Sequence, residues 1–176
     1  MRAAVFCGSS IGCPDDFAQA AADFGRSMAR AGVGIVYGGA SVGLMGVLAD
    51  AALAEGGEVI GVIPGGLFSE EVPHPGLTRL DVVSSMHERK AVMASLADGF
   101  AALPGRLGTL DELFEILTWR QIGLHAKPVA LLDVGGFWDP LASLLDGLLA
   151  AGFVSAANRD SLTRVRDASE FLRLMR

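Results

Sequence analysis

Five short runs of apolar residues constrain the fold of this chain more than any other feature. They are Ala3–Phe6, Gly34–Tyr37, Val59–Ile63, Phe100–Leu103 and Val129–Leu132. Their apolar residues follow one another without the alternation of a half-exposed strand, which is typical of parallel strands buried on both faces. A shorter extended segment is expected near Arg79–Val83. The pattern therefore predicts a parallel sheet covered on both sides.

Helical segments fill the intervals between these runs. We expect the first helix to begin around Pro14–Asp16 and to end at Gly32, and the second to run from about Gly43 to Glu55. An acidic first turn and a glycine after the last turn are common helix boundaries. Right-handed crossovers then give a doubly wound, Rossmann-like α/β sheet, with a ligand crevice at the carboxyl ends of the strands. We expect a single domain over residues 1–176, with a surface loop at Pro64–Gly76.

The net charge of the chain excludes some classes of function. A formal net charge of -6 argues against a nucleic-acid coat or a binder of anionic membranes, because both need a basic face. No run reaches the roughly 18 apolar residues of a membrane span, so we expect a cytoplasmic protein. Cys7, Cys13 and the histidines lack the spacing of a metal site, and we predict neither a metal nor a cofactor. Local positive charge must hold any anionic ligand.

Three of the apolar runs lead into glycine-rich turns, at Cys7–Ser10, Tyr37–Gly46 and Pro104–Thr109. Such turns expose backbone N–H groups at the amino end of a helix and let a phosphate approach closely. The lysine of a P-loop and the spacing of a dinucleotide fingerprint are missing. Gly8–Gly12 also fits G-x-S-x-G, although a nucleophile elbow usually follows several strands in a longer chain. A phosphate site at one sheet edge is the favoured interpretation.

The helix after the third turn allows two interpretations. Thr109 and Glu112 stand at capping-box spacing, and on spacing alone we favour a structural cap. Alternatively, the Glu112 carboxylate projects into the phosphate-lined crevice. The main apolar stripe of this helix is expected to be Leu110, Leu113, Phe114 and Leu117. A second flank with Ile116 and Trp119 predicts a surface for another copy of the chain.

A second helix is expected to start at Ser85, which stands at capping-box spacing from Glu88. Arg89 falls in the middle of its apolar stripe of Met86, Val92, Met93 and Leu96. Burying an unpaired guanidinium is costly, so Arg89 must meet an acid or an anion, unless its stem snorkels to solvent. Lys90 is interpreted as a solvated charge or a distal phosphate contact.

Together Tyr37–Gly46, Met86–Lys90 and Pro104–Glu112 resemble the Lonely Guy (LOG) family of cytokinin riboside 5′-monophosphate phosphoribohydrolases, often mislabelled lysine decarboxylases. The similarity runs from Cys7 to about Phe153, around the pattern P-G-G-x-G-T-x-x-E with an upstream R-K pair. The resemblance implies hydrolysis of the N-glycosidic bond of a purine nucleoside 5′-monophosphate, either AMP or a cytokinin-type nucleotide with an N6-substituted adenine. It also implies a homodimer with the active site near the interface.

The resemblance further implies that Arg89 and Glu112 are the catalytic pair and that Gly105, Gly108 and Thr109 hold the 5′-phosphate. The glycine-rich turns and the positions that match nucleotide contacts complete the expected binding set. Its other members are Gly8, Ser9, Ser10, Gly38, Gly39, Gly43, Met45, Glu71, Lys90, Arg106, Leu107, Asp111 and Thr118. Since fold alone does not give function, only matching positions are carried over.

Arg106 departs from the pattern, because it replaces the second glycine of P-G-G. If that position needs a positive φ or close approach of a phosphate, arginine strains the loop or blocks the ligand. Alternatively, the side chain turns outward or adds a charge-assisted contact to the phosphate. The sequence leaves these alternatives open. A second function class stays open with them, a non-catalytic nucleotide or molybdenum-cofactor carrier on the same fold.

Overall fold

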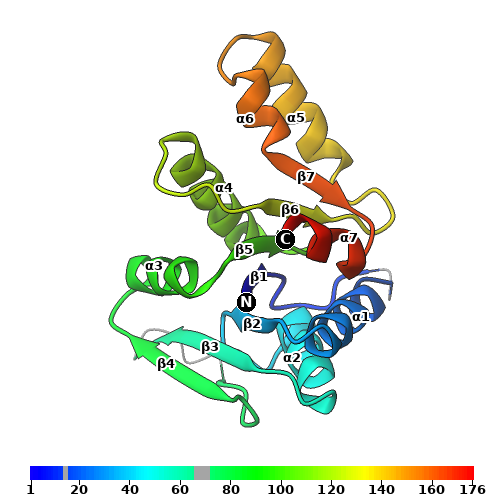
Figure 1. Cartoon of the computed structure of the whole chain (residues 1–176), viewed down its shortest axis with the longest axis vertical. Coiled ribbons are helices and arrows are strands. Elements are labelled where there is room, and N and C mark those ends of the chain that lie inside the picture. The colour runs from blue at the N-terminus through cyan, green and yellow to red at the C-terminus, as the bar shows by residue number, and fades with distance from the viewer. Residues whose placement is uncertain (14–15, 66–71) are drawn as a thin grey trace.

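The computed structural model describes residues 1–13, 16–65 and 72–176. Within these residues, seven parallel strands form one sheet in the order β4-β3-β2-β1-β5-β6-β7 (Figure 1). The strands are β1 Arg2–Phe6, β2 Gly34–Tyr37, β3 Val59–Pro64, β4 Arg79–Val83, β5 Gly99–Ala102, β6 Val129–Leu132 and β7 Leu162–Val165. The helices are α1 Asp16–Arg30, α2 Gly43–Ala54, α3 Met86–Leu96, α4 Leu107–Gln121, α5 Asp139–Ala150, α6 Ala156–Asp160 and α7 Ala168–Leu174.

Helices cover both faces of the sheet. α1, α2 and α7 pack on one face, and α3, α4 and α5 pack on the other (Figure 1). The central strands β1 and β5 are neighbours, with Val5 paired to Ala101. The chain leaves β1 toward β2 and leaves β5 toward β6, so the strand order reverses between them. In doubly wound sheets this reversal opens a crevice at the carboxyl ends of the two strands.

The expected α/β architecture is confirmed, and the six expected strands agree with the structure to within a residue at each end. Both helices with predicted boundaries are also present, α1 with Asp16 as its first residue and α2 from Gly43. Pro14 lies outside the described residues. The strand that the sequence did not reveal is β7, whose Thr163 and Arg164 interrupt its apolar pattern. These side chains are tolerated because β7 is an edge strand that pairs only with β6.

The amino end of α3 agrees with the capping prediction, but that of α4 does not. Ser85 Oγ accepts a 3.1 Å hydrogen bond from the Glu88 N–H at the start of α3. In α4 the residue before the first turn is Arg106, which makes no side-chain capping bond. Thr109 is already the third helical residue and is buried. The structural cap that spacing favoured at Thr109 is therefore wrong, because the helix starts three residues earlier than a Thr109 cap would require.

The predicted apolar stripe of α4 is confirmed for Leu113, which is buried, and for Leu110 and Leu117, which pack against the same core, but it is wrong for Phe114. Leu113 and Ile116 are buried against the sheet, whereas the Phe114 side chain is 37% exposed. Trp119 packs at the border of the same core cluster. Ile116 therefore cannot serve as a surface for another copy of the chain. Both flanks of α4 are apolar, so packing against the sheet decides which residues of each flank are buried.

Candidate functional site

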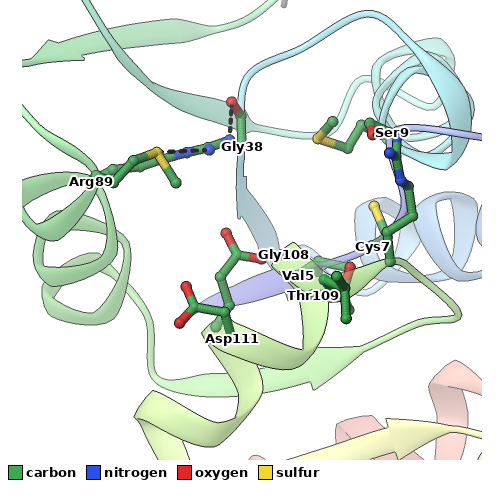
Figure 2. A pocket seen from close by; sticks show the side chains of 13 residues that line it. Val5, Cys7, Ser9, Gly38, Arg89, Gly108, Thr109 and Asp111 are labelled. Carbon is green, nitrogen blue, oxygen red and sulfur yellow. Dashed lines mark hydrogen bonds between the residues drawn. The ribbon is translucent and has the colours of Figure 1, made fainter. Parts of the chain in front are cut away.

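A cavity of about 310 Å³ opens at the reversal point between β1 and β5 (Figure 2). Its walls come from β1 and the loop after it, the end of β2, and the amino-terminal halves of α2, α3 and α4. The lining residues are Val5, Cys7, Ser9, Gly38, Met45, Met86, Arg89, Arg106, Leu107, Gly108, Thr109, Asp111 and Glu112. All three segments that carried the family resemblance thus contribute to one cavity.

Arg89 forms one wall of the cavity and is only 5% exposed. Its Nε donates to the Val62 carbonyl at 2.9 Å, and its Nη2 donates to the Gly38 carbonyl at 2.7 Å. Figure 2 shows the side chain extending from α3 toward Gly38. The interpretation in which Arg89 snorkels to solvent is therefore wrong. The backbone carbonyls at the ends of β2 and β3 hold the guanidinium at the cavity wall.

Gly38 shows how closely this wall is packed. A Cβ atom at Gly38 would lie 2.1 Å from Arg89 Nη2 and 3.0 Å from Met45 Sδ. A side chain at this position would displace the guanidinium, so the glycine is required by the approach of Arg89. The glycine-rich turn after β2 therefore positions an arginine as well as turning the chain.

Glu112 is half-buried and lines the cavity from the second turn of α4. Burial raises the pKa of the neighbouring Cys7 thiol, and the negative charge of Glu112 raises it further. Cys7 is therefore a neutral thiol in the cavity wall. Of the two interpretations of Glu112, the structure agrees with the one that directs its side chain into the crevice.

The amino end of α4 is built by close contacts between two loops. Gly8 N–H donates to the Pro104 carbonyl at 3.1 Å. A Cβ atom on Gly105 would lie 2.1 Å from Thr109 Oγ1, so glycine is required there for the first turn of α4 to close. The N–H groups of a first helical turn have no partner within the helix and carry a partial positive charge. Since Gly108 and Thr109 line the cavity, this end of it is suited to an anion.

Three expected glycines support the cavity from outside its lining. Gly43 has φ +59°, and a Cβ atom there would lie 2.3 Å from the Ser9 carbonyl carbon. Its neighbour Leu44 donates its N–H to the Gly8 carbonyl at 3.0 Å. Gly39, with φ +83°, accepts from the His74 N–H at 2.9 Å. Gly8, Gly39 and Gly43 thus hold the turns together, and Ser10 and Gly105 also lie outside the lining.

Lys90 and Thr118 lie away from the lining as well. Lys90 is 9% exposed, and its Nζ forms ion pairs with Asp111 at 3.0 Å and Glu115 at 3.1 Å. The interpretation of Lys90 as a solvated charge is therefore wrong. Thr118 Oγ1 donates to the Phe114 carbonyl at 2.7 Å and borders a separate groove between α4 and α5. Glu71 lies outside the described residues.

Val5, Cys7 and Met86 line the cavity although no role was predicted for them. Met86 stands inside a segment that carried the family resemblance, and Cys7 begins the glycine-rich turn after β1, so these two positions had a signal in the sequence. Across residues 1–13, 16–65 and 72–176, no group of three histidine, cysteine or acidic side chains could hold a metal ion. No helix in those same ranges is long and apolar enough to cross a membrane.

Comparison with known proteins adds relatives at high identity. The model of a family described as possible lysine decarboxylase matches residues 45–175. A probable cytokinin riboside 5′-monophosphate phosphoribohydrolase of Oryza sativa subsp. japonica is 46% identical over 174 residues, which are 99% of this chain and 78% of the relative. A cytokinin riboside 5′-monophosphate phosphoribohydrolase of Rhodococcoides fascians is 48% identical over 164 residues, which are 93% of this chain and 83% of that one.

Solved structures share the fold at much lower identity. The molybdenum cofactor binding protein of Rippkaea orientalis has a TM-score of 0.73 and 20% identity, covering 99% of this chain and 94% of that chain. The molybdenum cofactor carrier protein of Chlamydomonas reinhardtii has a TM-score of 0.71 and 21% identity, covering 99% and 97%. At these identities the likeness concerns the fold alone.

Proposed function

Because the chain belongs to the LOG family of cytokinin riboside 5′-monophosphate phosphoribohydrolases, we infer that it hydrolyses the N-glycosidic bond of a purine nucleoside 5′-monophosphate. The products are the free base and ribose 5-phosphate. The substrates are cytokinin-type nucleotides, with an N6-substituted adenine, or AMP. The observation that carries this function beyond the family name is the cavity that gathers Arg89, Glu112 and the amino end of α4.

We propose that the 5′-phosphate binds at the amino end of α4, against Gly108, Thr109 and Ser9. The phosphate is an anion, and the N–H groups and dipole of a helix amino end favour negative charge by about 0.3–1 kcal/mol. Ser9 offers a hydroxyl from the loop after β1, and it lines the same cavity. A phosphate held there directs the ribose toward the part of the cavity that Glu112 and Arg89 line.

Glu112 is the proposed catalytic carboxylate. As the bond from C1′ to the base nitrogen breaks, positive charge develops on the ribose ring. A carboxylate close to C1′ stabilises that charge and orients the attacking water. The water oxygen bonds to C1′ as the bond from C1′ to the base nitrogen breaks, the proton that the water loses passes to Glu112, and Glu112 gives one proton to the departing base. Water and nucleotide thus become free base and ribose 5-phosphate.

Arg89 is the proposed partner of Glu112 in this reaction. Its guanidinium is fixed by two backbone carbonyls and therefore keeps its orientation without a ligand. A fixed cation at the cavity wall orients the nucleotide and stabilises negative charge that lies in the cavity. These effects give Arg89 a positioning and electrostatic role, and the proton transfers are left to Glu112.

The direct test of this function is release of base. Purified protein is incubated separately with isopentenyladenosine 5′-monophosphate and with AMP, and the products are separated by chromatography. We expect free base and ribose 5-phosphate in equal amounts from at least one of the two. Tight nucleotide binding without release of base from either would instead indicate a nucleotide carrier.

We also propose that the protein is a homodimer, which forms through the outer flank of α4. Leu107 is 83% exposed and Phe114 37% on α4, and Ile122, the residue directly after the helix, is 64% exposed, and contact with water disfavours such apolar side chains. Leu107 also lines the cavity, so this interface would lie beside the active site. Light scattering should give twice the mass of the chain, and a monomeric mass at assay concentrations would contradict the proposal.

The cytoplasmic location that the sequence suggested stays a prediction.

A further inference from the structure

We propose that Arg106 is a phosphate clamp, a specificity-determining residue that selects nucleotides over nucleosides and retains ribose 5-phosphate. The proposal rests on the function above and adds a residue to its binding site. Arg106 is the residue that departs from the glycine of the family pattern. Three observations support the proposal: the backbone at this position, the placement of the side chain, and the state of the other cations around the cavity.

The backbone accepts arginine without strain. Arg106 has φ -93° and ψ -169°, an extended conformation that any residue adopts. Among the described residues, every positive φ belongs to a glycine. The Arg106 carbonyl accepts from the Leu110 N–H at 3.2 Å, so the residue starts α4 with its backbone alone. The strained-loop alternative is therefore ruled out, and the side chain is available for a ligand.

The side chain lies along the cavity at its anion-binding end. Arg106 lines the cavity together with Gly108 and Thr109 from the first turn of α4. Its Nη1 lies 3.4 Å from Ser9 Oγ, which comes from the loop after β1. The guanidinium thus spans from α4 to the opposite loop, across the place proposed for the phosphate. This contact is long and its partner is a neutral hydroxyl, so a dianion would be a much stronger partner.

The other cations around the cavity are already engaged. Arg89 donates to two backbone carbonyls, and Lys90 is held between Asp111 and Glu115. No ion pair within the described ranges involves Arg106. The chain as a whole carries a net charge of -6, which disfavours an anionic ligand. Arg106 supplies the local positive charge that a phosphate dianion requires.

The clamp has a particular kinetic signature. The phosphate lies away from C1′, and its charge is the same in substrate, transition state and product. Contacts to it therefore stabilise all three equally, which changes KM and leaves kcat little affected. Since ribose 5-phosphate carries the same phosphate, its dissociation constant should change by the same factor as KM. A catalytic or purely structural role would not couple these two constants.

The test compares Arg106→Gln and Arg106→Lys with wild type. Titration calorimetry measures the Kd of ribose 5-phosphate, and initial rates give KM and kcat for the nucleotide and kcat/KM for its nucleoside. For Arg106→Gln we expect both Kd and KM to rise about 10-fold to 100-fold, the range for hydrogen bonds to charged groups. The ratio of kcat/KM for the nucleotide to kcat/KM for the nucleoside should fall by the same factor as KM rises. Arg106→Lys should recover part of the lost affinity. Arg173→Gln removes an equally charged but distant exposed side chain and should change neither constant.

An Arg106→Gln protein with the Kd and KM of wild type would overturn the clamp. So would a rise in KM without a rise in the Kd of ribose 5-phosphate. A wild-type protein that releases no base, yet binds ribose 5-phosphate in an Arg106-dependent way, would refute the hydrolase function and support the clamp. The clamp and the hydrolase function can therefore be refuted independently of each other.

Discussion

Replacement of Glu112 by glutamine is expected to lower kcat for the nucleoside 5′-monophosphate by about 10²–10⁴-fold, the usual contribution of a positioned acid or base. Glutamine keeps the size of the side chain but cannot carry the negative charge that stabilises an oxocarbenium-like ribose. The binding of ribose 5-phosphate should change little, because the proposed phosphate contacts come from the amino end of α4. Steady-state kinetics and calorimetry measure the two effects separately.

The fold should tolerate this substitution. Glu112 lies in the second turn of α4, and the cap of that helix is the Arg106 backbone. Glutamine can still form hydrogen bonds, so the free energy of unfolding should fall by no more than about 2 kcal/mol. Glu115→Gln is the matched control, since it removes a half-buried carboxylate of the same helix outside the cavity. Turnover by Glu112→Gln at the wild-type rate would remove Glu112 from the mechanism.

Substitution of Arg89 should have the second-largest effect, and on two properties at once. Arg89→Ala removes a cavity cation, and we expect kcat/KM to fall by about 10²-fold or more. The same change leaves the carbonyls of Gly38 and Val62 without their donor. Each unsatisfied buried group costs about 1–3 kcal/mol, so denaturant unfolding should show a clearly less stable protein.

Arg89→Lys separates the two effects of Arg89. Lysine keeps the positive charge, but a single ammonium group lacks the planar fork of donors that reaches two separate carbonyls. We expect a folded protein that recovers part of the stability, with kcat still well below that of wild type. If Arg89→Lys turned over at the wild-type rate, charge alone would be sufficient, and the fixed orientation of the guanidinium would have no role in catalysis.

The fold could be predicted well where burial is complete. The strands β1, β2, β3 and β6 are buried along almost their whole length, and such strands leave uninterrupted apolar runs in the sequence. The edge strand β7 could not be found in this way. Its Arg164 is exposed and forms ion pairs with Asp133 and Asp139, which no local pattern reveals.

Helix faces and caps were less predictable, because long-range packing decides them. α4 carries apolar residues on two flanks, and the burial of Ile116 instead of Phe114 depends on how the helix meets the sheet. The turn at Gly105 places the first residue of α4 at Leu107, so the capping-box spacing of Thr109 and Glu112 was coincidental. The spacing of residues in the sequence determines which local contacts can form, and tertiary packing determines which of them do form.

The site could be predicted from motifs because glycine-rich turns after parallel strands meet at one sheet edge. Arg89 was singled out by chemistry alone, as a charge in an apolar stripe, and it is buried at the cavity wall. The sequence could not reveal that backbone carbonyls hold Arg89, or that Lys90 is enclosed by acids from α4. Nor could it give the backbone conformation at Arg106, which decides whether arginine fits there.

The central claim is that a phosphate at the amino end of α4 places the anomeric carbon of the sugar against Glu112. A crystal structure with bound ribose 5-phosphate tests it most directly. We expect the phosphate beside Ser9, Arg106 and the first turn of α4, with C1′ facing the Glu112 carboxylate and Arg89 on the adjoining wall. A sugar bound elsewhere, or turned so that C1′ points away from Glu112, would contradict the account.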